Sequence, residues 1–421
     1  MHHIEEKSAV KTLRRVSVAV ALGAVLQAQA MFEIPALTGR EAIGTTSWRV
    51  TDAARPETFA GPGVQRQVEV LAWYPSAARS GGAAAPSLRE GLSEVQDFAG
   101  LVSAPRTVWD RLADVRTHAT LDADPLGGAT KFPVLVFSHG YGSLPSAHAA
   151  LLEDLASHGY AVLSIVHPYE SLAATLQNGR VVSLLDEKGA PRHGYFEVVK
   201  EWEKEDETMA AVTSAAGEPG DDVQRRLLRE YITAIPKTTL ALQRWSDDTK
   251  LALDTLSSLP PGSAAGKLAA RLDLTRLGVF GHSMGGVTAG QFCVEDRRCR
   301  AGLNLDGILQ SGTMIDTPLG RPFLMVYSAR PGRLGANDAI YRRAAKPYIR
   351  VDVANTLHLS FIDMIFWSGP LRDRGAFGTI APDRAAAITR AIVREYFDQT
   401  LLGKKSPLLE GKSGFAEVTV K

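Results

Sequence analysis

The sequence predicts an α/β fold, a mostly parallel, doubly wound sheet with helices on both faces. From Phe132 onward, short apolar runs alternate with helical segments, a pattern typical of parallel strands joined by helical crossovers. With 421 residues and 45% hydrophobic side chains, the chain can bury one large core. Its charge is nearly balanced, with 47 Lys and Arg against 46 Asp and Glu, so a nucleic-acid partner is disfavoured.

The predicted elements form one domain over residues 31–421. The predicted strands are residues 47–52, 64–74, 133–138, 160–166, 274–280, 301–305, 322–327 and 348–353. The predicted helices are residues 145–157, 239–259, 287–293, 338–345 and 382–399. Residues 76–90 are rich in Ala, Gly, Ser and Pro, and we expect them to form a flexible surface loop.

Residues 186–236 interrupt this alternation and are interpreted as a helical insertion. They are highly charged at residues 201–207 and are broken near Gly217 and Gly220. Two amphipathic helical pieces flank the break. An insertion at this point of a sheet commonly covers a substrate pocket as a lid, and the alternative is a solvated helical decoration.

Residues 1–30 have the features of a secretory signal peptide. Basic residues precede an apolar run at residues 16–26, and Ala28-Gln29-Ala30 offers the small-x-small pattern that a signal peptidase cuts. The apolar run is short for a membrane-spanning helix, although a retained anchor stays as the alternative. We therefore expect cleavage near Ala30 and export to the periplasm or the medium, with no membrane span in the mature chain.

Export bears on the two cysteines, Cys293 and Cys299. In an oxidising compartment they could close a small disulfide loop. A continuous helix would hold them too far apart, but the intervening Val-Glu-Asp-Arg-Arg suggests a helix end where the chain turns back. Two unpaired thiols are the alternative.

The pentapeptide Gly281-His282-Ser283-Met284-Gly285 has the pattern of a nucleophile elbow. It follows a predicted strand and precedes a predicted helix. On such a sharp turn a serine hydroxyl can meet a base, and the helix N-terminus faces the developing negative charge. The glycines at both ends supply the small side chains that a tight turn needs. An ordinary Gly/Ser turn is the alternative.

Asp306 and His358 are the predicted partners of Ser283. Asp306 directly follows the strand at residues 301–305, which places it at the carboxyl edge of the sheet, where ligands bind in open α/β sheets. His358 lies in the loop after the strand at residues 348–353, and the order Ser, Asp, His is usual for this architecture. Competing acids that do not directly leave a strand beyond the elbow are Asp316, Asp338, Asp352 and Asp363. Among the competing histidines, His158 and His167 are expected to serve as caps or polar contacts, and His282 is held inside the elbow with its side chain pointing away from Ser283.

The oxyanion hole is expected from two backbone N–H groups, those of Met284 and Tyr141. Tyr141 lies in the loop at residues 138–142, after a predicted strand, where Gly140 and Gly142 let the chain turn toward the elbow. We expect the Tyr141 ring to be free to line the acyl pocket. A packed tyrosine in a glycine turn is the alternative.

These segments resemble the type II platelet-activating factor acetylhydrolases, secreted and intracellular, and their bacterial relatives. The resemblance covers roughly residues 64–370, and the matching segments are residues 137–142, 154–160, 281–286, 301–306 and the loop with His358, Phe361 and Asp363. It implies an α/β-hydrolase fold and a calcium-independent esterase, with the roles given above for the serine, acid, base and two amides. Met284 stands where the animal enzymes have an aromatic residue, and Tyr141 stands where they have an aliphatic one. The resemblance therefore implies the fold and the triad but not a phospholipid substrate.

Together these features predict an exported serine carboxylic ester hydrolase that works through an acyl-enzyme. It would release short acyl groups, such as acetyl, from phospholipid-like or small esters. No metal or organic cofactor is expected, because His358 can generate the nucleophile, and the oligomeric state stays open. A polyester or cutinase-type hydrolase, or a general lipase or esterase, is one alternative, because the elbow and the aromatic oxyanion residue also resemble those enzymes. A non-catalytic binding protein on a hydrolase scaffold is another, which the complete triad disfavours.

Overall fold

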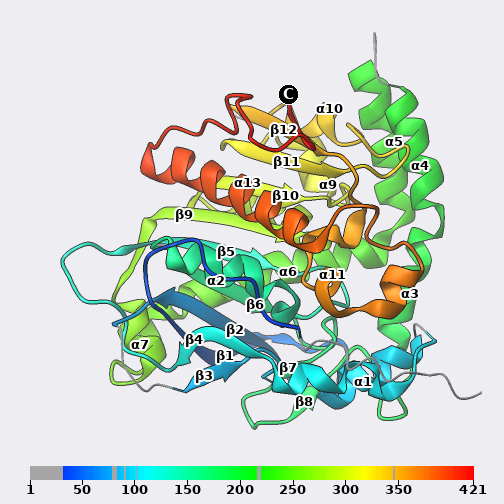
Figure 1. Cartoon of the computed structure of the whole chain (residues 1–421). Coiled ribbons are helices and arrows are strands. Elements are labelled where there is room, and N and C mark those ends of the chain that lie inside the picture. The colour runs from blue at the N-terminus through cyan, green and yellow to red at the C-terminus, as the bar shows by residue number, and fades with distance from the viewer. Residues whose placement is uncertain (1–31, 78–82, 90–91, 102, 216–219, 345–346) are drawn as a thin grey trace, which may run out of the picture. The chain divides into compact units, whose positions relative to one another are not determined.

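The chain folds around a central sheet. A computed structural model describes residues 32–421 except 78–82, 90–91, 102, 216–219 and 345–346. The sheet has eleven strands in the order β13-β12-β11-β10-β9-β5-β6-β2-β1-β4-β3 (Figure 1). They are β1 (Ile43–Pro56), β2 (Gln65–Pro75), β3 (Ala84–Pro86), β4 (Arg116–Leu121), β5 (Phe132–Ser138), β6 (Ala161–Val166), β9 (Leu272–His282), β10 (Cys299–Leu305), β11 (Phe323–Ser328), β12 (Tyr348–Val353) and β13 (Val418–Val420). A separate hairpin pairs β7 (Ala174–Thr175) with β8 (Val181–Val182).

The middle of this sheet is parallel. Strands β6, β5, β9, β10, β11 and β12 are joined by parallel pairings. On one side β2 pairs antiparallel with both β6 and β1, and on the other β13 pairs antiparallel with β12. The predicted mostly parallel sheet is therefore confirmed, and its parallel strands place their carboxyl ends at one common edge.

Helices cover both faces of the sheet, so its central strands are buried on both sides. In β5, Leu135 and Phe137 belong to one core, and Val134 and Val136 to the other. The first core is closed by α2 (Ala149–Ser157) and α13 (Pro382–Leu402), which lie in front of the sheet in Figure 1. The second is closed by α6 (Pro236–Asp254) and α8 (Met284–Glu295). This is the doubly wound arrangement.

Several short elements depart from the sequence-based expectation. Residues 84–86, expected within a flexible loop, form β3, because Ala84 and Pro86 pair with β4. Neither strand has a run of β-branched or aromatic residues that would predict it. The predicted helix at residues 338–345 is only α10 (Asp338–Tyr341). Further helices outside residues 186–236 are α1 (Leu92–Leu101), η1 (Arg106–Asp114), η2 (Pro145–His148), η4 (Leu256–Ser258), α7 (Ala264–Ala269), α9 (Gly312–Asp316), η5 (His358–Phe361), α11 (Met364–Trp367) and α12 (Gly369–Asp373).

The segment at residues 186–236 folds into helices that are tied to the sheet by polar contacts. It contains α3 (His193–Glu201), η3 (Trp202–Lys204), α4 (Glu205–Ser214) and α5 (Gly220–Ala234), and α4 and α5 pack side by side (Figure 1). The Thr213 hydroxyl donates to the Gly332 carbonyl at 2.6 Å, and Arg229 pairs with Asp316 at 2.8 Å. The first contact reaches the loop after β11, and the second reaches the end of α9, which follows β10.

The N-terminal prediction falls largely outside this structure. The predicted signal peptide, residues 1–30, lies outside the described residues. Within the described part of the chain, no helix combines the length and the apolar character needed to cross a bilayer. The longest of these helices, α13 with 21 residues, carries several charged side chains such as Arg390 and Asp398.

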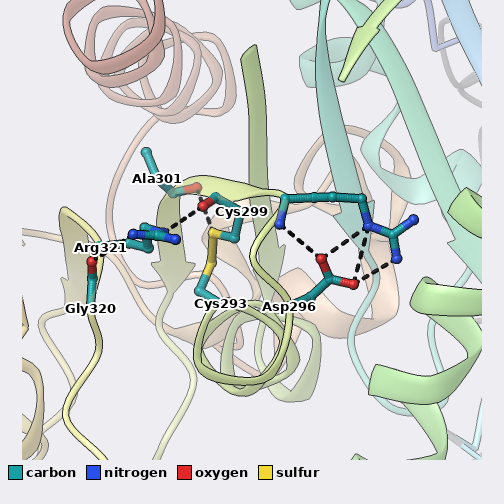
Figure 2. The surroundings of a disulfide bond; sticks show 7 residues. Cys293, Asp296, Cys299, Ala301, Gly320 and Arg321 are labelled. Carbon is teal, nitrogen blue, oxygen red and sulfur yellow. Dashed lines mark hydrogen bonds and ion pairs between the residues drawn. A yellow bond between two sulfur atoms is a disulfide. The ribbon is translucent and has the colours of Figure 1, made fainter. Parts of the chain in front are cut away.

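A disulfide between Cys293 and Cys299 joins the end of α8 to the first residue of β10 (Figure 2). The helix ends at Glu295, and the turn that follows brings the two Cα atoms to 5.1 Å from each other. Asp296 holds this turn by accepting from the Arg298 backbone N–H at 2.8 Å. The disulfide thus braces the entry to the strand that ends just before Asp306.

Replacing both cysteines by alanine is expected to lower the free energy of unfolding by about 2 kcal/mol, because the unfolded chain gains the freedom that the closed loop removes. Urea unfolding of the wild-type protein and the Cys293→Ala, Cys299→Ala variant measures the loss. Reduced wild-type protein is the matched control, because reduction opens the disulfide but leaves both cysteine side chains in place. An equal effect of the reductant on the double variant would contradict this assignment.

Candidate active site

Ser283 lies at the tight junction between β9 and α8. Its backbone has φ 57° and ψ −126°, a conformation that costs a non-glycine residue energy and that clusters at functional sites. The Ser283 N–H donates to the Leu305 carbonyl at 2.9 Å, and the Ser283 carbonyl accepts from Gly286 N–H at 2.9 Å. The serine is therefore fixed between the end of β10 and the first turn of α8, in the strand–turn–helix setting of a nucleophile elbow.

Two glycines make this turn possible. A Cβ atom at Gly285 would overlap the carbonyl oxygen of Ser138, and one at Gly281 would overlap the backbone of Gly285. The first turn of α8 therefore lies directly against the end of β5. This contact sets the distance between the elbow and the loop that follows β5.

His358 and Asp306 form a hydrogen-bonded pair beside the elbow. His358 Nδ1 lies 2.8 Å from Asp306 Oδ2, and the Asp306 side chain is 1% exposed against 26% for His358. Ser328 also binds the carboxylate, since its N–H donates to Oδ1 at 2.8 Å and its hydroxyl to Oδ2 at 2.9 Å. Burial alone would raise the pKa of Asp306, but the hydrogen bond to His358 and the charge of Arg330 lower it to about 2. Asp306 is thus held as a carboxylate facing the imidazole.

His282 connects the elbow to the loop of His358. Its Nε2 lies 2.9 Å from the His358 carbonyl oxygen, and the two rings are 4.5 Å apart. Burial and the neighbouring His358 lower the pKa of His282 to about 3, so its ring is neutral. Because a carbonyl oxygen only accepts, Nε2 must carry the proton. The side chain next to Ser283 therefore holds the backbone of the predicted base.

The competing acids, and the competing histidines other than His282, are engaged elsewhere. Asp316 pairs with Arg229, Asp338 and Asp352 both pair with Arg350, and Asp363 accepts from the Ala150 N–H. His158 contacts the Thr38 hydroxyl, and His167 contacts Asp248. Within the described residues, Asp306 is the acid that the structure brings to His358.

The loop after β5 lies against the elbow. A Cβ atom at Gly140 would come within 3.2 Å of His282 Nδ1 and 3.3 Å of Ser283 Cβ. Gly142 has φ +78°, and its N–H donates to the Glu170 carbonyl at 2.9 Å. Within the described chain, neither the Tyr141 N–H nor the Met284 N–H donates to another loop or helix-end carbonyl. Both residues belong to the segments that meet at Ser283.

The Tyr141 ring is packed rather than free, which corrects the sequence-based expectation. It stacks on Tyr195 with ring centroids 5.2 Å apart, and it meets Trp202 edge-on at 5.5 Å. Trp245 of α6 lies 5.9 Å away. Tyr195 and Trp202 belong to α3 and η3, so the segment at residues 186–236 covers the ring that was expected to be open to the pocket.

A buried charge cluster beneath this loop was not predicted from the sequence. Glu170, whose carbonyl holds Gly142, accepts from Arg244 Nη2 at 2.6 Å and from Trp245 Nε1 at 3.1 Å. Arg66 joins the cluster through Glu170 at 3.6 Å and pairs with Asp248 at 2.6 Å. Burial opposes the charge on Asp248, but Arg66 and His167 lower the pKa of this carboxyl far below its usual range. Arg66, Glu170 and the α6 residues Arg244, Trp245 and Asp248 come from three separate parts of the sequence, so no local pattern reveals the cluster.

No metal site accompanies these residues in the part of the chain that the structure describes, where no group of three or more His, Cys, Asp and Glu side chains is arranged to hold an ion. The site consists of side chains and backbone amides at the carboxyl edge of the sheet. Ser328 was missed in the sequence analysis, although it ends β11, the strand that pairs with β10 in front of Asp306.

This strand order, with an antiparallel second strand, an elbow after β9, an acid after β10 and a histidine after β12, defines the α/β-hydrolase fold. The sequence profile of the family described as "Platelet-activating factor acetylhydrolase, isoform II" matches residues 86–372, well over half of the chain. The chain belongs to this family.

Curated relatives are similar over part of their length. A platelet-activating factor acetylhydrolase of Cavia porcellus is 25% identical over 262 residues, which cover 59% of this chain and 52% of that protein. A probable 1-alkyl-2-acetylglycerophosphocholine esterase of Arthroderma benhamiae is 22% identical over 326 residues, which cover 72% of this chain and 68% of that protein. The chain thus spans about half the length of the animal relatives that it matches.

A solved structure is similar over nearly the whole chain. The ferulic acid esterase from Streptomyces cinnamoneus superposes with a TM-score of 0.69 at 27% sequence identity, and the match covers 93% of this chain and 99% of that one. The similarity therefore includes the elements outside the family match as well as the central sheet.

Asp363, five residues after His358, is expected to make stability depend on pH. Burial raises the pKa of this carboxyl to about 7 from an unfolded value of 3.8. The folded state holds the proton of Asp363 more tightly than the unfolded state does. The resulting contribution to the free energy of unfolding is therefore complete below pH 4 and is lost as the pH rises toward 7. The wild-type free energy of unfolding should fall by about 3 kcal/mol between pH 5 and pH 8 on this account.

Asp363→Asn removes this titration but keeps an oxygen for the Ala150 N–H, so urea unfolding at the two pH values should show a flatter dependence for this variant. Asp316→Asn, at an exposed position, is the control. An equal slope for the wild-type protein and Asp363→Asn would refute the assignment.

Proposed function

We propose that the protein is a carboxylic ester hydrolase in which Ser283, His358 and Asp306 form a catalytic triad. The observation that carries the proposal is the hydrogen-bonded pair of His358 and buried Asp306 beside a strained serine at a helix N-terminus. Family membership and the esterase fold of the solved relative support the same reaction class. A non-catalytic binding protein would have no need for the strained serine backbone.

In this mechanism, His358 Nε2 takes the proton from the Ser283 hydroxyl as its oxygen attacks the ester carbonyl. Asp306 orients the imidazole through Nδ1 and stabilises the imidazolium that forms. The N–H groups of Met284 and Tyr141 bind the tetrahedral oxyanion, and α8 directs its N-terminus at that charge. His358 returns the proton to the leaving alcohol, and water then hydrolyses the acyl-enzyme by the same steps.

For the substrate, we propose a short acyl ester, such as an acetyl group on a phospholipid-like or small alcohol. The names of the curated relatives support an acetyl ester. A second candidate is an ester of an aromatic acid, because the rings of Tyr195 and Trp202 gather next to the loop of Tyr141 and the solved relative is a ferulic acid esterase.

We also propose that the protein is exported after cleavage near Ala30. The disulfide between Cys293 and Cys299 supports this, since such bonds persist mainly in oxidising compartments.

Asp306→Asn is expected to keep the fold and to lose about 10³–10⁴-fold in kcat, because a neutral amide neither orients His358 correctly nor stabilises its charged form. Steady-state kinetics with p-nitrophenyl acetate measure the loss, and circular dichroism checks the fold. Asp316→Asn is the matched control and should retain activity, since Asp316 pairs with Arg229 on the surface. If Asp306→Asn hydrolyses the ester at the wild-type rate, the triad acid is another residue.

A substrate panel distinguishes the candidate functions. It comprises p-nitrophenyl esters of increasing chain length, a 2-acetyl phospholipid, methyl ferulate and an aromatic polyester film. We expect the highest kcat/KM among the acetyl esters, and no hydrolysis by Ser283→Ala. Activity on the film alone would instead identify a polyester hydrolase, and activity on methyl ferulate alone an aromatic-acid esterase. Failure of a fluorophosphonate to label Ser283 in folded protein would favour the binding-protein alternative.

A further inference from the structure

The triad acid carries a second cationic partner besides His358. Arg330, in the loop after β11, places Nη2 at 3.0 Å from Asp306 Oδ2, and the same nitrogen lies 3.3 Å from the Asp306 carbonyl oxygen. The Arg330 side chain is 20% exposed, whereas the carboxylate is almost completely buried. A buried contact of this kind is weakly screened by water and salt.

We propose that Arg330 sets the basicity of His358, by sharing the charge of Asp306 and so keeping the imidazole neutral, and ready to act as a base, at lower pH. The proposal rests on the proposed function, because it concerns the base of that reaction. Arg330 would act through Asp306 without touching the substrate, so it is a positioning residue.

The geometry of the carboxylate makes the two partners competitors. Oδ1 accepts from the Ser328 N–H, while Oδ2 receives the Ser328 hydroxyl, His358 Nδ1 and Arg330 Nη2. His358 and Arg330 therefore share one oxygen. A positive charge on the same carboxylate oxygen as an imidazole disfavours the imidazolium, and it also weakens the attraction that Asp306 exerts on that form.

Other charged and titratable groups lie near Asp306, Arg330 and His358. Arg333, in the same loop as Arg330, pairs with Glu205 at 3.0 Å and also with Asp206, both on α4. His282, the further titratable group packed on His358, is neutral because burial lowers its pKa to about 3. Arg333 is therefore already paired with carboxylates of α4, one of which is exposed, and Arg330 is the guanidinium that offsets the buried charge of Asp306. Without Arg330, His358 would be the one cationic partner left to that carboxylate among the contacts described above.

The loop of Arg330 is fixed in place, so the contact does not depend on a freely moving side chain. The Ala329 N–H donates to the Thr356 carbonyl at 3.0 Å, two residues before His358. The Thr213 hydroxyl of α4 holds the Gly332 carbonyl, and Arg333 is 5% exposed. The loop of His358, the loop of Arg330 and α4 are therefore joined by direct contacts around Asp306.

The test is the pH dependence of kcat/KM for p-nitrophenyl acetate in wild-type protein, Arg330→Met and Arg330→Lys. We expect the acid limb of Arg330→Met to move to higher pH by about one unit, and that of Arg330→Lys to stay within a few tenths of the wild type. Arg330→Gln, which keeps a hydrogen-bond donor without the charge, should shift like Arg330→Met and serves if the methionine variant does not fold. Arg229→Met, which removes an arginine at an exposed ion pair, is the matched control and should leave the limb unchanged.

A second readout separates this proposal from the proposed function. The His358 ring signals can be titrated by NMR in wild-type protein and in the folded Arg330 variants, whether or not any ester is hydrolysed. A higher titration midpoint in Arg330→Met and Arg330→Gln supports the proposal even if the substrate panel fails. Equal midpoints in wild-type protein and both neutral variants, or an equal shift in Arg330→Lys and Arg330→Met, would overturn it.

Discussion

The backbone contact between the first turn of α8 and the end of β5 is the constraint on which the site depends. Gly285 lies so close to the Ser138 carbonyl that no side chain fits between them. This contact fixes the elbow on β9 relative to the loop that carries Tyr141, and the pairing of β9 with β10 then fixes Asp306 relative to Ser283. The proposed nucleophile, acid and oxyanion donors are therefore held by main-chain geometry, which costs no reorganisation during a reaction.

The sequence predicts those parts of the fold and site that rest on contiguous patterns. The parallel strands are short apolar runs, and Ser283, Asp306 and His358 each follow one of them, so their common edge could be inferred before the structure. Ser328 and Arg330 could not, because their approach to Asp306 follows from the register in which Leu305 lies opposite Val326. The role of the two cysteines was left open, and the structure joins them because the helix ends between them.

The largest departures arise where distant segments decide the outcome. The Tyr141 ring was expected to be open, but Tyr195 and Trp202 cover it, and nothing local to residues 138–142 indicates these partners. Likewise, the charge cluster of Glu170, Arg244 and their neighbours gathers residues from several elements under one loop. Buried ions of this kind contribute little net stability when paired, but removing one partner leaves an uncompensated charge.

The packing of Tyr141 against α3 and η3 also bears on how this protein could diverge or be engineered. Because the ring sits on a loop that carries a proposed oxyanion donor, the segment at residues 186–236 is mechanically part of the catalytic loop. Exchanging that segment for the corresponding segment of a relative would therefore change more than the substrate contacts that the segment makes. It would also replace the support of the proposed oxyanion amide, so on the proposed mechanism specificity and rate would change together.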